Sequence, residues 1–94
     1  MHYLYILFSN KLNKFYIGET VDYEVRTQQH NQNYFTKSFT GRANDWSLKL
    51  AFSCKNKAEA KKLEKFIKKQ KSRVFIEKVI QNPNILDDII QNKL

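Results

Sequence analysis

Arg26 and His30 are a pair of side chains whose types and spacing suit phosphate chemistry. They lie four positions apart in a segment predicted to be helical, so both can reach the same small volume. An arginine presents a planar fork of donors that fits phosphate oxygens, and a histidine exchanges its proton near neutral pH. The alternative is that both are ordinary surface side chains.

Glu64 is the most informative single residue because of its place on a second predicted helix. On a helical wheel it lies beside Ala60, at the edge of the apolar stripe, while the lysines of this helix fan out on the far side. A carboxylate half-turned toward the core needs a partner there. On these residues alone we favour a salt bridge to Lys61, Lys68 or Arg26.

Tyr5 and Tyr16 are expected on two paired strands. The segment Tyr3–Phe8 is aromatic and aliphatic throughout, which predicts a central strand buried on both faces. A polar, turn-prone loop joins it to a second short strand over Phe15–Gly18, so the two should form a hairpin. The alternative role for each tyrosine is ordinary packing, with the hydroxyl finding some partner. A third strand with one buried face is predicted over Trp46–Phe52.

The helices that must position the other side chains have recognisable start signals. Thr20 or Asp22 can cap a helix that runs to about Asn31, and its thin apolar side suggests that it covers the sheet only partly. Asn56, with an acid three positions later, resembles a capping box. The later helical segments are expected over Asn56–Gln70, 74–80 and 84–91, with Pro83 interrupting between the last two.

These elements predict one small α/β domain over residues 1–94. A three-stranded, mostly antiparallel sheet is flanked by helices in the order β-β-α-β-α-α, with no internal repeat. A chain of 94 residues leaves no room for a second core. Hydrophobic residues make up 41% of the chain and aromatic residues 14%, which predicts a packed core and excludes a disordered chain.

The charge distribution favours a polyanionic partner. The formal net charge is +8, and the span 55–78 holds ten Lys and Arg residues against three acids. A basic face attracts nucleic acid because each neutralised phosphate releases condensed counterions. The alternative is a solvated, lysine-rich helix with no partner.

Cysteine usage and hydropathy bound the cellular setting. Cys54 is the sole cysteine, which excludes a disulfide framework within one chain and a cysteine-based zinc site. We therefore expect a reducing, cytoplasmic location. The apolar stretch near the first residue is too short for a signal peptide. No segment approaches the roughly 20 apolar residues of a membrane span, so no membrane partner is expected.

Several short motifs occur in the order and at the spacings of one nuclease family. They are Tyr3-Leu4-Tyr5, Tyr16-Ile17-Gly18, Arg26-x-x-x-His30, Thr36-Lys37, Asp45-Trp46-x-Leu48 and Ala58-x-Ala60-x-x-x-Glu64-Lys65-x-Ile67-Lys68. Together they resemble the GIY-YIG nucleases, whose name comes from the first two motifs. The resemblance covers nearly the whole chain and implies a small standalone GIY-YIG-like nuclease domain.

The resemblance also implies a catalytic role for five residues. Tyr16 matches the motif tyrosine that helps to deprotonate the attacking water, and Tyr5 matches its partner, which orients the water or contacts the scissile phosphate. Arg26 matches the arginine that stabilises the charge of the transition state. His30 matches a position that assists the motif tyrosine in some members. Glu64 matches the sole protein ligand of a divalent cation.

The expected cofactor and partner follow from the same resemblance. The expected cofactor is Mg²⁺ or Mn²⁺. The expected partner is a nucleic acid, with DNA favoured, and the expected setting is DNA repair or recombination. Hydrolysis builds negative charge on phosphate oxygens, so a cation and an arginine aimed there lower the barrier. Mg²⁺ often takes only one or two carboxylates, so one glutamate suffices. The cations expected to contact nucleic acid are Lys37, Arg42, Lys61 and Lys68.

The sequence departs from the family pattern at three places. Tyr3 stands where the first motif has glycine, at the start of a strand where Tyr5 need not be disturbed. Glu19 follows the second motif where some relatives carry a lysine, which removes that electrophilic help. Many relatives also have an asparagine after the glutamate helix, whereas residues 71–80 contain none and Asn82 is only a loose candidate.

Three functions remain open at this point. The first is a metal-dependent endonuclease, the second a nucleic-acid-binding module of the same fold without catalysis, and the third an unrelated protein-interaction domain. The sequence offers no zinc finger or helix-turn-helix to place a reading group in a groove. We therefore expect modest sequence preference, or preference for a DNA structure such as a flap or a single-stranded end.

Overall fold

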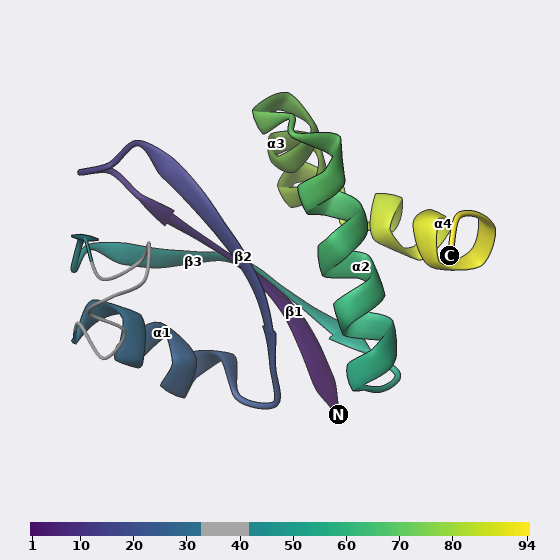
Figure 1. The fold of residues 1–94 in the computed structure, drawn as a ribbon, viewed down its shortest axis with the longest axis horizontal. Helices are drawn as coiled ribbons and strands as arrows, with labels where there is room; N and C mark the ends of the chain where they lie inside the picture. Colours follow the sequence, from purple (N-terminus) through teal and green to yellow (C-terminus); the bar gives the residue numbers. More distant parts are fainter. Residues whose placement is uncertain (33–41) are drawn as a thin grey trace.

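The protein forms a three-stranded sheet with four helices, as a computed structural model that describes residues 1–32 and 42–94 shows (Figure 1). The predicted order β-β-α-β-α-α is present, and the last helix, expected from sequence over 84–91 after Pro83, follows it. The elements are β1 His2–Ser9, β2 Lys14–Thr20, α1 Tyr23–Asn31, β3 Trp46–Cys54, α2 Lys57–Gln70, α3 Arg73–Gln81 and α4 Asn84–Asn92.

β1 is the central strand of an antiparallel sheet with the order β2-β1-β3. Leu4, Tyr5, Ile6 and Leu7 are all almost completely buried, which confirms the strand predicted to be covered on both faces. The hairpin between β1 and β2 is also confirmed, with Ser9 paired to Lys14 across the turn. This pairing sets which residues of the two strands face the same side.

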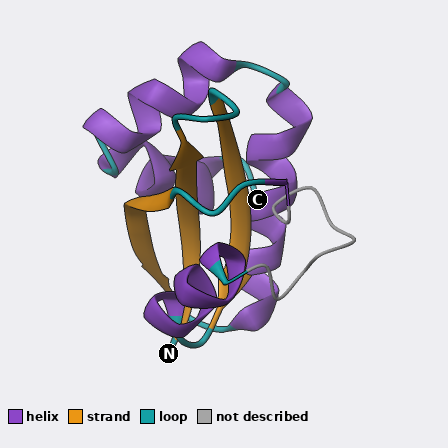
Figure 2. Ribbon diagram, turned by 90° about the vertical axis from the view of Figure 1, so that its left-hand side faces the viewer, coloured by secondary structure: helices purple, strands orange, loops and turns teal. Residues whose placement is uncertain are grey.

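The two faces of the sheet are covered by different helices (Figures 1 and 2). On one face, Leu4 and Ile6 pack into a core with residues of α2, α3 and α4, among them Leu63. On the other face, Tyr5 and Leu7 form a smaller cluster with Trp46 on the side covered by α1. Because neighbouring residues of a strand point to opposite faces, β1 supplies both clusters.

α1 has little apolar surface, packs on the sheet through Tyr23 and His30, and makes polar contacts at its two ends. Asp22, one of the two predicted caps, accepts hydrogen bonds from the backbone N–H groups of Glu24 and Val25. At the other end, the Asn31 amide donates to the Trp46 carbonyl at 2.8 Å and accepts from the Trp46 N–H at 2.6 Å. These contacts fix α1 against the start of β3.

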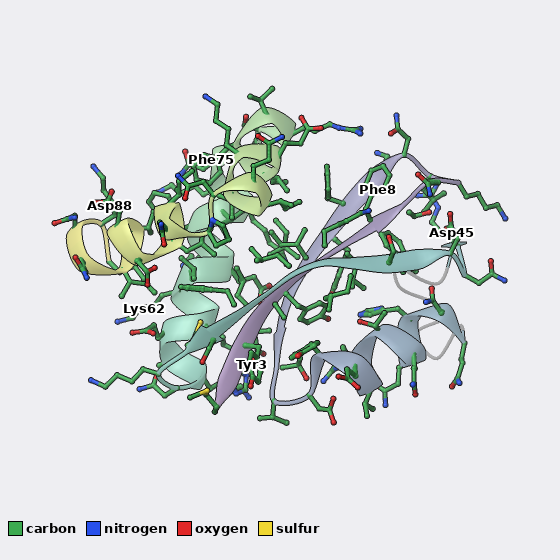
Figure 3. The ribbon with its side chains drawn as sticks, turned by 180° about the vertical axis from the view of Figure 1, so that it is seen from behind. Tyr3, Phe8, Asp45, Lys62, Phe75 and Asp88 are labelled. Atoms are coloured by element: carbon green, nitrogen blue, oxygen red, sulfur yellow. The ribbon has the colours of Figure 1, made fainter. Side chains whose placement is uncertain are left out.

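Two further polar contacts position the other elements. Asn56 caps α2 by accepting from the Glu59 N–H at 2.9 Å, as the capping-box pattern predicts, but the Glu59 carboxylate accepts from the N–H of Lys55, one residue before the cap, and not from that of Asn56. Asp45 accepts from the Ser9 hydroxyl at 2.5 Å, which ties the start of β3 to the β1–β2 turn (Figure 3).

Within the described residues, no helix is long and apolar enough to cross a membrane.

Candidate active site

Tyr5 and Gly18 are direct cross-strand partners, and the phenol ring lies over the glycine. A Cβ atom at position 18 would stand 2.6 Å from the Tyr5 hydroxyl oxygen, so any larger residue would push the ring away. Tyr16 lies two residues before Gly18 and therefore faces the same side, with its ring centroid 6.2 Å from that of Tyr5. The glycine of the Tyr-Ile-Gly motif thus makes room for the first tyrosine.

His30 is the hydrogen-bond partner of Tyr5. The distance between the Tyr5 hydroxyl oxygen and His30 Nε2 is 3.0 Å, and both side chains are buried. Burial, followed by the neighbouring Tyr16, raises the pKa of Tyr5 well above its ordinary value, although the charge of Arg26 acts in the opposite direction. We therefore assign the hydroxyl as the donor and His30 Nε2 as the acceptor.

Burial also keeps the imidazole of His30 uncharged at neutral pH. Burial, with a smaller contribution from the Arg26 guanidinium, lowers the pKa of His30 to about 4. The sequence resemblance paired this histidine with Tyr16, whereas the hydrogen bond joins it to Tyr5. Tyr16 contacts the imidazole through its ring, at a centroid distance of 4.9 Å.

Tyr16 lies on an edge strand of the sheet and contacts side chains from four elements, among them Tyr5 on β1 and His30 on α1. The indole of Trp46, on β3, packs against its ring in an edge-on geometry at a centroid distance of 6.4 Å. The Lys68 ammonium, on α2, lies 5.7 Å from the ring centroid. Tyr16 therefore connects the α1 face of the sheet to α2.

Lys68 links this tyrosine to Glu64, because it contacts both side chains. Its Oε2 atom accepts a hydrogen bond from Lys68 Nζ at 2.6 Å, so one of the salt bridges expected from the sequence is present. The Glu64 side chain is 23% exposed, compared with 50% for Lys68. Both residues line a hollow of about 520 Å³ on α2, together with Lys61, Lys65 and Lys69.

Two more of the predicted catalytic residues, Arg26 and Glu64, act electrostatically on Tyr5. The charges of Arg26 and Glu64 both shift the pKa of Tyr5, with opposite signs. Arg26 also acts on His30, one helical turn further along α1. Tyr5, Tyr16 and His30 are thus in direct contact, Lys68 links Tyr16 to Glu64, and Arg26 acts on Tyr5 and His30 through its charge.

The donor set around Glu64 fits a hard cation that keeps most of its water. The described residues contain no cluster of three His, Cys, Asp or Glu side chains that could hold a metal ion. A partly exposed carboxylate in an open hollow can still bind Mg²⁺ or Mn²⁺ through one oxygen, with water and phosphate completing the shell. Glu64 fits this chemistry, in competition with the Lys68 ammonium.

The cations expected to contact nucleic acid have different positions. Lys61 and Lys68 line the hollow that contains Glu64. Arg42 is exposed at the start of the segment before β3. Lys37 lies outside the described residues. The loosely matched Asn82 caps the C-terminal end of α3 and is not among the residues that line the Glu64 hollow.

Three residues near the site had no role assigned from sequence. Gly18 was expected to let another group approach its bare backbone, but Tyr5 was not named as that group, and Trp46 was identified only as a motif match. The Glu19 carboxylate forms an ion pair with His2 Nε2, and its charge contributes to the raised pKa of Tyr5. The β1–β2 pairing that brings His2 and Glu19 together follows from the hairpin, so register was the signal that could have revealed the pair.

Comparison with known proteins gives one family-level finding. Residues 1–78 match the family model described as the GIY-YIG catalytic domain. No curated protein and no solved structure gives a significant match. The matched span includes all three strands, α1, α2 and most of α3, and with them every residue of the candidate site.

Proposed function

Because this chain belongs to the GIY-YIG family, a family of nucleases, we propose that it is a metal-dependent endonuclease that hydrolyses phosphodiester bonds of DNA. The observation that supports this proposal is that two phenols and an imidazole are in contact, while Lys68 links one phenol to the Glu64 carboxylate and the Arg26 guanidinium acts on the other phenol and the imidazole through its charge. These are the groups that water attack on a phosphodiester needs. They are Tyr5, Tyr16, Arg26, His30 and Glu64.

The two tyrosines take different parts in this mechanism. The raised pKa of Tyr5 means that its hydroxyl keeps its proton, which suits a group that orients water or a phosphate oxygen. Tyr16 is half-buried, lies next to the Lys68 ammonium and is the better candidate to accept a proton from the attacking water. His30 holds the Tyr5 hydroxyl in place rather than exchanging its proton with it.

Arg26 and Glu64 handle the charge that develops on the phosphate. The Arg26 fork can donate to two phosphate oxygens and is charged at every relevant pH. Glu64 would hold the divalent cation, which supplies Lewis-acid stabilisation when it is bound. Because Lys68 already neutralises this carboxylate, we expect weak cation binding without substrate phosphates to complete the shell.

Plasmid cleavage tests the proposal. Purified protein is incubated with supercoiled DNA and Mg²⁺ or Mn²⁺, and nicked and linear products are quantified over time. Glu64→Gln and Arg26→Ala should each slow cleavage by about 100-fold or more, because each removes charge stabilisation at the transition state. Glu77→Gln is the matched control, since that glutamate is half-exposed on α3. Cleavage unchanged in both site variants would contradict the proposal.

A nucleic-acid-binding module without catalysis is the second candidate. The observation in its favour is Glu19, which is held by His2 and puts a negative charge where some relatives carry a lysine. This candidate would show DNA binding that weakens steeply with salt, with no strand scission under any divalent metal. Scission that depends on Glu64 would exclude it.

A further inference from the structure

A groove of about 440 Å³ leads away from the candidate active site, between β2 and the region where α2 ends and α3 begins. Lys14, the first residue of β2, lines it near the hairpin turn, and Tyr16 lines it two residues further along the strand. Lys68 lines this groove and also the hollow that holds Glu64. The groove therefore adjoins the hollow that contains Glu64, with Lys68 between the two.

The groove combines an apolar floor with a cationic rim. Phe15, Ile17 and Ile67 supply half-buried or buried apolar surface along its floor. Lys68 and Lys71 are exposed along its rim, as is Lys14. Phosphates would lie against the lysines, while a base could stack on the phenyl ring of Phe15.

This chemistry selects an unpaired strand over a duplex. A duplex presents phosphates on its outside but keeps the faces of its bases stacked, so it would leave the apolar floor unused. A single strand offers phosphates and base faces together, and binding of this kind tolerates any sequence. We propose that the groove binds the unpaired DNA strand adjacent to the scissile phosphate. The strand's place beside the reacting bond rests on the proposed function.

The walls of the groove are held together before any strand binds. Arg73, at the start of α3, donates to the Asn13 carbonyl and to its side-chain oxygen, each at 2.9 Å. Its guanidinium also lies 5.4 Å from the Phe15 ring centroid and 5.6 Å from that of Phe8. Arg73 thereby links the hairpin turn to α3, and a preformed groove loses less entropy on binding.

Binding without divalent ions tests the groove separately from catalysis. Fluorescence anisotropy compares a blunt DNA duplex with the same duplex carrying a single-stranded arm, over a series of salt concentrations. In the unmodified protein the arm should tighten binding by about 5-fold or more, which corresponds to one stacked base and its phosphates. The arm should also steepen the salt dependence, because it adds phosphate contacts.

The decisive variant combines Lys14→Gln with Lys71→Asn. Lys71 has a φ of 50°, and asparagine tolerates this left-handed conformation, so the turn should survive. In this variant the single-stranded arm should tighten binding by less than about 2-fold, and the salt dependence of binding should be reduced. The affinity for the blunt duplex should change much less. The matched control is Lys62→Gln with Lys93→Gln. It removes the same charge from α2, where Lys62 lines a different hollow, and from the residue that follows α4.

A second variant tests the floor. Phe15→Leu keeps an apolar side chain but removes the aromatic ring, and should lower the arm's advantage without changing the salt dependence. Thermal melting of each variant shows whether it has folded. The groove proposal would be overturned if the arm did not tighten binding to the unmodified protein. It would also be overturned if the arm tightened binding to the double lysine variant as much as before. A protein that shows the expected arm effect but never cleaves would overturn the proposed function alone.

Discussion

At the scale of single residues, burial decides what each titratable group of the site can do. A free tyrosine and a free histidine differ by only a few pKa units, but burial raises the pKa of Tyr5 and lowers that of His30. Both groups are therefore uncharged at neutral pH, and their contact is a hydrogen bond between neutral partners. Proton transfer is left to the more accessible Tyr16 in the proposed mechanism.

The lowered pKa of His30 makes the fold sensitive to mild acid. In the unfolded chain the imidazole binds a proton near pH 6.5, whereas in the fold it does so only near pH 4. The unfolded state therefore binds more protons in this window, and stability should fall as pH drops from 6.5 toward 4. The expected loss is about 3 kcal/mol over the whole window, measured by urea unfolding at several pH values.

His30→Gln is the matched control for this pH effect, because glutamine can still accept from the Tyr5 hydroxyl but does not titrate. His2 and the carboxylates are common to both proteins, so the difference between the two pH profiles isolates His30. The variant should have a flatter profile between pH 6.5 and 4. Parallel profiles would mean that the imidazole titrates alike in the folded and unfolded chains.

At the scale of elements, α1 carries two catalytic candidates on a helix with little apolar surface. Val21, just before it, is 68% exposed and Val25 is 47% exposed, so the packing of the helix comes mainly from Tyr23 and the buried His30. The Asp22 cap and the Asn31 contacts to Trp46 hold its two ends. The positions of Arg26 and His30 should therefore depend on these polar contacts as well as on packing.

Replacing the cap residue of α1 tests this dependence. Asp22→Ala leaves the N–H groups of Glu24 and Val25 without their acceptor, and should cost about 1 kcal/mol. Hydrogen exchange should accelerate within α1 but not within α2, and cleavage should slow as Arg26 becomes less well held. Asp22→Ser restores the acceptor and should recover most of both properties. Equal exchange rates in the alanine and serine variants would show that the cap is not what holds α1.

At the scale of the whole molecule, the core extends past the region that matches the family. The match ends at residue 78, but α4 contributes Leu86 and Ile89 to the cluster that also contains Leu4, Ile6 and Leu63. The same cluster supports the side of α2 from which Glu64 reaches the candidate site. A helix outside the matched region therefore stabilises the element that presents the metal-binding candidate.

Truncation of a buried side chain in α4 should reveal this support. Leu86 is fully buried, so Leu86→Ala should lower the free energy of unfolding by about 2–4 kcal/mol through lost burial and a cavity. Asp87→Ala, on the next residue and exposed, should change it by less than about 0.5 kcal/mol. Urea denaturation measures both. If the two variants have equal stability, α4 does not belong to the cooperative core.

Sequence patterns alone determined the elements and the candidate residues. Hydrophobic runs and caps are local signals, so the central strand, the hairpin and the start of α2 were all predicted correctly. The motif spacing likewise identified the family, which the match over residues 1–78 shows. The salt bridge of Glu64 was also predicted, because its partner Lys68 lies one turn away on the same helix and can be found from sequence spacing.

Only the tertiary structure decided which side chains meet across the chain. His30 is hydrogen-bonded to Tyr5 instead of Tyr16, and Arg73 joins the hairpin at Asn13, a residue 60 positions earlier. Such contacts depend on strand register, helix placement and burial together, and no local pattern encodes them. The pKa values of the site have the same origin, because desolvation exists only once the core has closed.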